Sequence, residues 1–169
     1  MKKMLFLLCL MCMGVFSAAA QKLALVDMDY ILKKDPAYEL MNKQLEELSK
    51  RWQNEVSALE TKAQAAYKSY QTDIAFLSAE QKKAREEAIV SAEKQAYELK
   101  RRYFGPEGEL VKRRETQMKP IQDKVWQAMK TLARTQGYQL IIDRTSSKIV
   151  YADPSLDISD TLAAQLGLR

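Results

Sequence analysis

The central part of the chain repeats its apolar positions at the spacing of a long helix. Between residues 38 and 77, apolar or small side chains recur in steps of three and four, and most positions between them are charged or polar. The mean step of about 3.55 residues lies between the period of a coiled coil and that of a straight helix. This seam consists of Tyr38, Met41, Leu45, Leu48, Trp52, Val56, Leu59, Ala63, Ala66, Tyr70, Ile74 and Leu77. The pattern predicts a long, gently coiled helix that starts at Asp35-Pro36.

This helix is predicted to turn back near Ser78. No glycine or proline occurs over residues 37–104, and a single helix of that length would span about 100 Å. Ser78 followed by Gln81 has the pattern of a capping box, and the apolar register shifts at the same place. The returning seam consists of Ile89, Ala92, Ala96, Leu99, Tyr103, Leu110, Val111, Met118, Ile121, Val125, Ala128 and Leu132. An unbroken helix through Ser78 is the alternative.

Residues 35–137 are therefore predicted to form one long antiparallel helical hairpin, which we call the arm. Gly137 is expected to end it, and Pro120 is expected to kink the returning helix or to start a new segment.

A cluster of Gly105, Pro106 and Gly108 interrupts the returning helix. A phosphate-binding loop would need a strand before the glycines, and the two glutamates at 107 and 109 would repel phosphate. A linker between domains fits poorly, because the helical pattern resumes within a few residues. Folding back at Ser78 places Trp52 opposite Phe104, so we predict a hinge or fixed bend of the arm, formed by Gly105, Pro106, Gly108 and Trp52.

The segments before and after the arm have the composition of strands. Residues 22–28, KLALVDM, are apolar on both faces, as in a strand buried on both sides. Residues 138–143 and 148–153 are rich in β-branched and aromatic side chains and predict a β-hairpin. A short helix over 161–166, capped by Asp157 or Ser159 and ended by Gly167, should follow.

Such short strands cannot bury their apolar faces within one copy of the chain. We therefore expect residues 21–34 and 138–169 to form a small β-rich body by oligomerisation, from which the arm projects. The predicted fold class is α+β, mostly α.

The first twenty residues have the pattern of a secretory signal peptide. Lys2 and Lys3 precede an apolar run that is too short to span a bilayer, and Ala18 and Ala20 fit a cleavage site after residue 20. A membrane anchor is the alternative, but no stop-transfer segment follows. The chain is thus expected to be exported and then soluble.

Composition argues against catalysis. Both cysteines, Cys9 and Cys12, lie in the leader, and the chain has no histidine. The commonest general base, metal ligand and thiol nucleophile are thus missing from the chain after the leader, so no enzyme, cofactor or metal site is predicted. The net charge of +5 falls to +3 without Lys2 and Lys3, and the excess lies in residues 78–137. Nucleic-acid binding is not expected, because the first helix is neutral and the chain is exported.

The order of these elements resembles the Skp/OmpH family of periplasmic chaperones. The resemblance covers the whole chain after the leader and rests on KLALVDMDYIL, on charged helices, and on YQLIIDRTSSKIVYADPSLDISDTLAAQLG. The tip sequence LSAEQ and the Gly-Pro-x-x-Gly break depart from the family's usual pattern. The resemblance implies a homotrimer whose helical arms enclose a cavity. It also implies an ATP-independent holdase in the periplasm, which binds unfolded outer-membrane proteins. An exported coiled-coil adaptor for a folded partner is the alternative function.

Side chains beside the seam are the candidates for contacting an unfolded client. The aromatic candidates are Tyr67, Phe76, Tyr97 and Phe104, whereas aromatic residues on the seam are assigned to helix packing. The basic candidates form two triplets and are Lys100, Arg101, Arg102, Lys112, Arg113 and Arg114. We expect them to attract acidic clients or anionic lipid headgroups, although many charges here also fit solvated helix faces.

Overall fold

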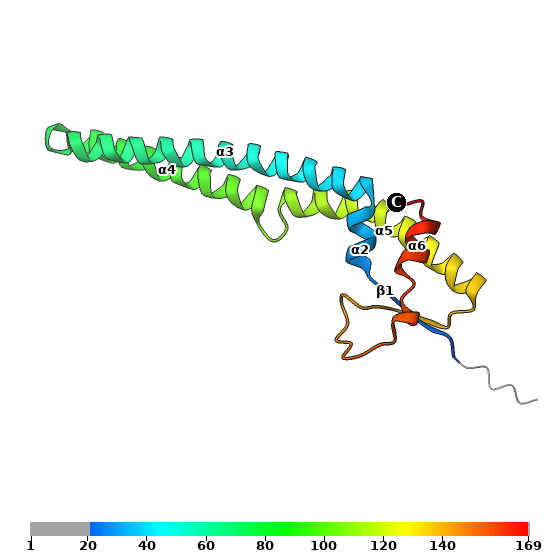
Figure 1. The fold of residues 1–169 in the computed structure, drawn as a ribbon. Coiled ribbons are helices and arrows are strands. Elements are labelled where there is room, and N and C mark those ends of the chain that lie inside the picture. The colour runs from blue at the N-terminus through cyan, green and yellow to red at the C-terminus, as the bar shows by residue number, and fades with distance from the viewer. Residues whose placement is uncertain (1–20, 169) are drawn as a thin grey trace, which may run out of the picture.

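The computed structural model describes residues 21–168, and the predicted signal peptide with its cleavage site at Ala18 and Ala20 lies outside them. A helical rod projects from a smaller body that holds both ends of the described chain (Figure 1). In chain order the elements are β1 (Leu23–Val26), α2 (Met28–Lys34), α3 (Pro36–Asp73), the 3₁₀ turn η1 (Ile74–Phe76), α4 (Ala79–Phe104), α5 (Glu109–Gln136), β2 (Leu140–Asp143), the 3₁₀ turn η2 (Pro154–Leu156) and α6 (Ser159–Gln165).

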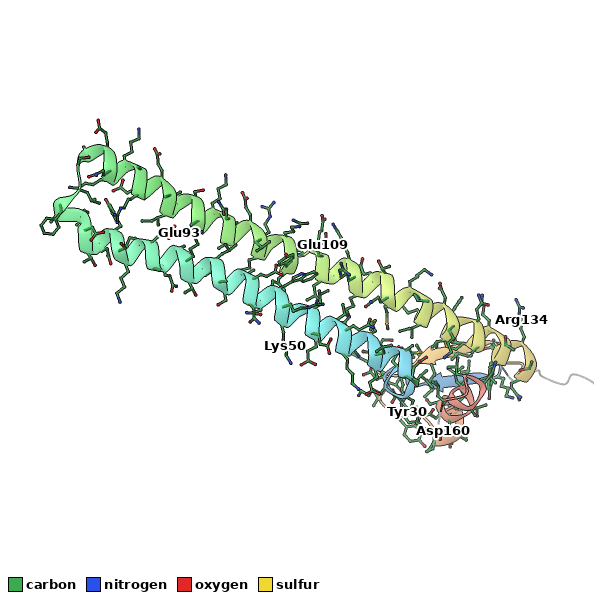
Figure 2. The ribbon with its side chains drawn as sticks, turned by 90° about the horizontal axis from the view of Figure 1, so that it is seen from above. Tyr30, Lys50, Glu93, Glu109, Arg134 and Asp160 are labelled. Carbon is green, nitrogen blue, oxygen red and sulfur yellow. The ribbon has the colours of Figure 1, made fainter. Side chains whose placement is uncertain are left out.

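The rod is the predicted antiparallel hairpin. Helix α3 runs outward, and α4 and then α5 return along it (Figures 1 and 2). Asp35 caps α3 by accepting a hydrogen bond from the Ala37 N–H at 2.9 Å. At the tip the capping box is confirmed: the Gln81 N–H donates to Ser78 Oγ at 3.2 Å, and the Ser78 N–H donates to Gln81 Oε1 at 2.9 Å. Local capping therefore sets both the start and the turn of the arm.

The apolar seam is buried along most of the arm. Its buried side chains are Met41, Trp52, Val56, Ala63 and Tyr70 on α3, Ile89 and Ala96 on α4, and Ile121, Val125 and Leu132 on α5. The prediction was wrong for Ala66, Ile74 and Val111, which are exposed. Ile74 opens the 3₁₀ turn at the tip, where the regular repeat of α3 has ended.

Pro120 neither breaks α5 nor starts a new segment, contrary to that prediction. The helix runs continuously from Glu109 to Gln136 with Pro120 inside it. A proline here removes one main-chain hydrogen bond, at a cost of about 3 kcal/mol. The buried side chains Ile121 and Val125 lie one and five residues after it, and Lys124 pairs with the buried Asp35 at 3.1 Å. Packing against the rest of the molecule therefore holds the helix together across the proline.

The two strands form a parallel pair. Leu23 lies opposite Leu140, and Val26 lies opposite Asp143. The predicted hairpin of 138–143 with 148–153 was wrong, because β2 takes β1 as its partner and residues 148–153 form no strand within the described chain. The Arg144 N–H donates to the Val26 carbonyl, and the turn that follows leads the chain away from the sheet. Strand β1 is also shorter than predicted, because Asp27 caps α2, a helix that the sequence analysis missed.

The core of the body surrounds β1. The other side of β1 meets residue 157 in an isolated bridge, and the Ile158 N–H donates to the Leu25 carbonyl at 2.9 Å. Helix α6 begins at Ser159, slightly earlier than predicted, and its N-cap is Ile158 instead of the predicted Asp157 or Ser159. The buried apolar residues of this core are Ala24, Val26, Ile31, Val125, Leu132, Ile158, Leu162, Ala163 and Leu168. Contrary to the prediction, one copy of the chain buries Ala24, Leu25 and Val26 of β1, whereas Leu23 of β1 and Leu140 of β2 remain exposed.

Candidate functional site

Three of the four aromatic residues predicted beside the seam are exposed on the arm. Phe76 at the tip is 90 % exposed, Tyr97 on α4 is 65 % exposed and Tyr67 on α3 is 49 % exposed. Phe104, by contrast, is only partly exposed, because its ring packs edge-on against Trp52. The arm therefore presents large apolar groups to solvent at the tip and along its length.

The tip is held in place by polar contacts between its two helices. The Arg85 guanidinium pairs with the Asp73 carboxylate at 2.8 Å, and the Tyr70 hydroxyl donates to Glu86. That hydrogen bond raises the pKa of Tyr70 above its ordinary value, because the carboxylate stabilises the protonated phenol. Phe76 therefore projects from a turn whose flanking helices are tied together.

The returning helix is interrupted where the sequence predicted, between Phe104 and Glu109, and Trp52 lies beside the interruption as expected. The Trp52 and Tyr103 rings are stacked, with centroids 4.4 Å apart and planes 6° apart. Phe104 meets Trp52 at 6.4 Å and 81°, while the guanidinium of Arg113 lies 5.8 Å from the Trp52 ring. The Tyr103 hydroxyl also donates to the Glu55 carboxylate at 2.7 Å. We call Trp52, Tyr103, Phe104 and Arg113 the aromatic clamp.

The two basic triplets do not form one continuous patch. A surface groove of about 840 Å³ brings Arg101, Arg102 and Lys112 together, next to Tyr97 and the loop 105–108. Lys100 instead pairs with Glu60 across the arm at 3.6 Å, and Arg113 belongs to the aromatic clamp. Arg114 is exposed on α5. The groove also contains three acidic residues, Glu98, Glu107 and Glu109, so its positive charge is partly compensated.

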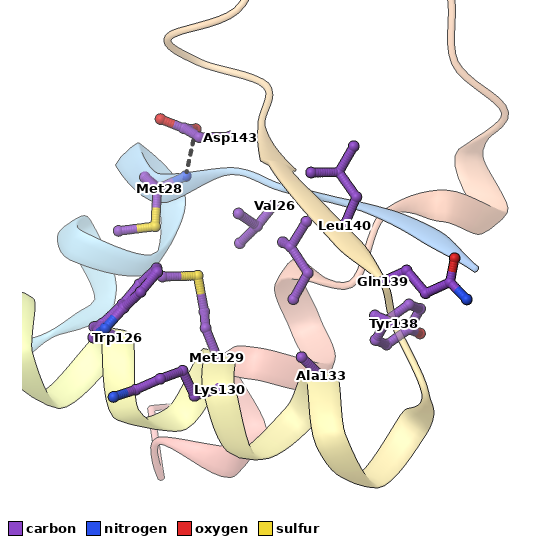
Figure 3. Close-up of a pocket in the computed structure, with 11 residues that line it drawn as sticks. Val26, Met28, Trp126, Met129, Lys130, Ala133, Tyr138, Gln139, Leu140 and Asp143 are labelled. Atoms are coloured by element: carbon purple, nitrogen blue, oxygen red, sulfur yellow. Dashed lines mark hydrogen bonds between the residues drawn. The ribbon is translucent and has the colours of Figure 1, made fainter. Parts of the chain in front are cut away.

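An apolar pocket in the body was not predicted from the sequence. It has a volume of about 360 Å³ and lies between α5 and β2 (Figure 3). Its walls include Met28, Trp126, Met129, Tyr138 and Leu140, of which Trp126 and Leu140 are exposed. Trp126 directly follows the buried Val125 of the seam, and this position beside the seam is the signal that could have identified it.

A second apolar surface lies in the segment that was predicted to be a strand. Val150 is fully exposed, Tyr151 is 82 % exposed, and Ile149 is also exposed. This segment follows β2 after the turn at 144–147, and its β-branched and aromatic residues suit a pleated sheet. Residues 149–151 therefore form an exposed apolar surface on the body.

Ion pairs and hydrogen bonds of charged residues connect α2, the turn after β2 and the segment before α6. Arg144 donates from Nη2 to Asp27 Oδ2 at 2.9 Å and from Nη1 to Asp157 Oδ2 at 2.7 Å. Asp27 Oδ1 also accepts a hydrogen bond from the Tyr30 N–H at 2.8 Å, and this bond and Arg144 hold the pKa of Asp27 below its ordinary value. Nearby, the Tyr30 hydroxyl donates to Asp160 at 2.5 Å (Figure 2). These contacts join α2, the turn after β2 and the start of α6.

Within residues 21–168, no cluster of three or more potential ligands could hold a metal ion. Among the helices described, none combines the length and the apolar character that crossing a bilayer requires.

The fold and its exposed surfaces define a protein with a helical arm, suited to binding other chains. Comparison with known proteins agrees: the model of the OmpH-like outer membrane protein family matches residues 22–166. The chain therefore belongs to the Skp/OmpH family of chaperones, which confirms the resemblance seen in the sequence.

Similar proteins support this assignment along the whole chain. The chaperone protein Skp of Yersinia enterocolitica is 27 % identical over 150 residues, which cover 89 % of this chain and 88 % of that protein. The chaperone protein Skp of Photorhabdus luminescens is 27 % identical, with 95 % and 98 % of the two chains covered. A crystal structure of a putative outer membrane chaperone (OmpH-like) from Caulobacter crescentus has the same fold, with a TM-score of 0.69, 11 % identity, and 88 % and 85 % of the chains covered.

Proposed function

We propose that this protein is an ATP-independent holdase of the periplasm, which binds unfolded outer-membrane proteins and prevents their aggregation. Family membership supports a chaperone role. The observation that carries the more specific proposal is the exposure of Tyr67, Phe76 and Tyr97 along the helical arm. Isolated aromatic groups on a polar surface offer many weak contacts, which suit a client without a fixed shape.

Positive charge contributes to capture. Arg101, Arg102 and Lys112 lie around the groove next to Tyr97. We propose that they attract acidic stretches of the client, or anionic lipid headgroups during delivery, and that the aromatic groups then retain the client. Because these charges are exposed, their contribution should decline as the salt concentration rises.

A triple variant tests the aromatic contacts. Replacing Tyr67, Phe76 and Tyr97 by serine should weaken binding of an unfolded outer-membrane β-barrel about tenfold, because three exposed rings are lost and the seam is retained. The matched control replaces the exposed polar residues Gln64, Gln71 and Gln95 by serine. Fluorescence titration of the labelled client measures both. Equal affinities of the triple variant and the wild-type protein would contradict the assignment, whereas nanomolar binding of one folded protein would favour an adaptor.

We also propose that the body assembles as a homotrimer. Within the described residues, β2 is paired on one side only, and the exposed residues Ile149, Val150 and Tyr151 lie in a segment that suits a strand. Adding this segment of a second copy to the free edge of β2 would cover the pocket around Trp126 and Leu140. A third copy closes the ring without leaving an edge.

Mutation of the exposed segment tests this assembly. Val150→Lys together with Tyr151→Lys should convert the trimer to monomers, because charged side chains would enter the apolar contact. Light scattering after size exclusion measures the mass, with Ser146→Lys and Ser147→Lys in the adjacent turn as the control. A wild-type monomer, or a trimer that both variants leave intact, would contradict the proposed interface.

A further inference from the structure

The break in the returning helix, at residues 105–108, lies opposite helix α3, which is not interrupted. Helix α3 continues from Pro36 to Asp73 and passes the break at Trp52 without interruption. In both views α4 and α5 follow one another along α3, and in Figure 1 the loop 105–108 projects away from the rod. Bending the arm at the loop would therefore also require bending α3.

The apolar seam keeps its phase across the loop. Tyr103 on α4 and the buried Ile121 on α5 are 18 residues apart in the sequence. At 3.6 residues per turn, this separation is about five complete turns. The seams of α4 and α5 thus face α3 in the directions they would have in one uninterrupted helix. The four residues from 105 to 108 take the place of about one helical turn.

The loop itself is tightly closed. The Gly105 N–H donates to the Arg101 carbonyl and the Gly108 N–H donates to the Gly105 carbonyl, both at 2.8 Å. Both glycines have negative φ angles that any residue adopts, so they are required for space. A Cβ at Gly105 would lie 2.4 Å from the Arg101 carbonyl oxygen, and a Cβ at Gly108 would lie 2.7 Å from the Tyr103 carbonyl oxygen. The main chain is therefore packed against itself.

The aromatic clamp spans this loop. Tyr103 and Phe104 come from the last turn of α4, whereas Arg113 comes from the beginning of α5. All three contact Trp52, which is 8 % exposed and belongs to α3. One side chain of the unbroken helix thus holds both sides of the break.

We propose that residues 105–108 form a fixed, in-line joint, an opened helical turn locked by the aromatic clamp, and that α4 and α5 behave as a single rigid strut. Of the two alternatives predicted from the sequence, a moving hinge and a fixed bend, the joint differs from both. It does not move, and it does not redirect the arm. This inference concerns the mechanics of the arm and stands whether or not the arm binds unfolded clients.

Distances between spin labels across the joint test this proposal. The chain from Gln21 onward contains no cysteine, so Glu93→Cys on α4 and Gln122→Cys on α5 give two defined labels. Asn42→Cys and Gln71→Cys on the unbroken α3 are a matched control, because both pairs are exposed and 29 residues apart. An ideal helix of that length spans about 44 Å, which suits pulsed electron resonance. Dilution with unlabelled protein removes distances between copies.

The joint predicts that the two pairs give distance distributions of equal width, and that adding an unfolded outer-membrane β-barrel leaves both unchanged. Replacing residues 105–108 by four alanines should preserve the mean distance of the 93/122 pair, because a continuous helix has the same phase. Trp52→Ala should broaden that pair alone, with helicity checked by circular dichroism. A wild-type distribution at least twice as broad as the control, or a mean distance shifted by the client or by the alanines, would overturn the proposal. If Trp52→Ala leaves the width unchanged, the clamp does not lock the joint.

Discussion

At the scale of single residues, Asp27 shows how one carboxylate connects several parts of the body. It ends β1, caps α2 through the Tyr30 N–H and receives the guanidinium of Arg144. Arg144 in turn holds Asp157, whose Oδ1 accepts hydrogen bonds from the N–H and hydroxyl of Ser159. The charged form of Asp27 is favoured in the folded protein, so its pKa is lowered.

This lowered pKa gives the stability of the body a defined pH dependence. The ordinary pKa of the Asp27 carboxyl is 3.8 and the folded value lies below it. The resulting stabilisation is fully present above the unfolded pKa and disappears as the pH falls through the folded pKa. Asp27→Asn retains a good cap but loses the charge, so urea unfolding should show lower stability at pH 7 and a smaller loss of stability between pH 5 and about pH 3. Asp29→Asn, in the same helix, is the control, and an identical pH dependence in Asp27→Asn and the wild type would contradict this role.

Sequence patterns predicted individual side chains best where a helix repeats them. The period of the seam identified Trp52, Val56 and Ile89 as buried, because each turn of the arm has the same environment. It failed for Ile74, because the repeat ends at the tip, and also for Ala66 and Val111, which are exposed within regular helices. The exposed Trp126 and the partners of Arg144 were not identified, because they depend on contacts between distant parts of the chain.

At the scale of elements, local signals were sufficient for helix ends and insufficient for strand pairing. Asp35-Pro36, Ser78 with Gln81, and Gly137 with its left-handed φ of 73° all act on neighbouring main-chain groups. The pairing of β1 with β2 joins residues separated by the whole arm, and no local pattern specifies it. Helix α2 was missed because the apolar run 22–28 continues past the cap at Asp27.

The capping box at the tip predicts a local effect of mutation. Ser78→Ala removes the acceptor for the Gln81 N–H, which should weaken the start of α4 by about 1 kcal/mol. Hydrogen exchange of the amides in the first turns of α4 should accelerate about fivefold, while exchange in α5 remains unchanged. Ser91→Ala, at an exposed position in the middle of the same helix, is the control. Unchanged exchange near the tip in Ser78→Ala would show that the box does not stabilise the turn.

At the scale of the whole molecule, the protein combines a long arm with a body that one copy leaves partly uncovered. The arm is tied at its tip, at the aromatic clamp and at its base by Asp35 and Lys124. The exposed apolar groups are found at two places, the surface of the arm and the region around β2 and residues 149–151. We assign the first to clients and the second to other copies of the chain. The resemblance to the Skp/OmpH family predicted this division of the molecule.

The measurement that tests the central claim most directly is the aggregation of an outer-membrane β-barrel diluted from urea, followed by light scattering. The chain from Gln21 onward, at about one proposed trimer per client and without ATP, should suppress the scattering almost completely. An equal mass of an unrelated protein of the same net charge should not. Scattering that rises equally in both samples would contradict the holdase account.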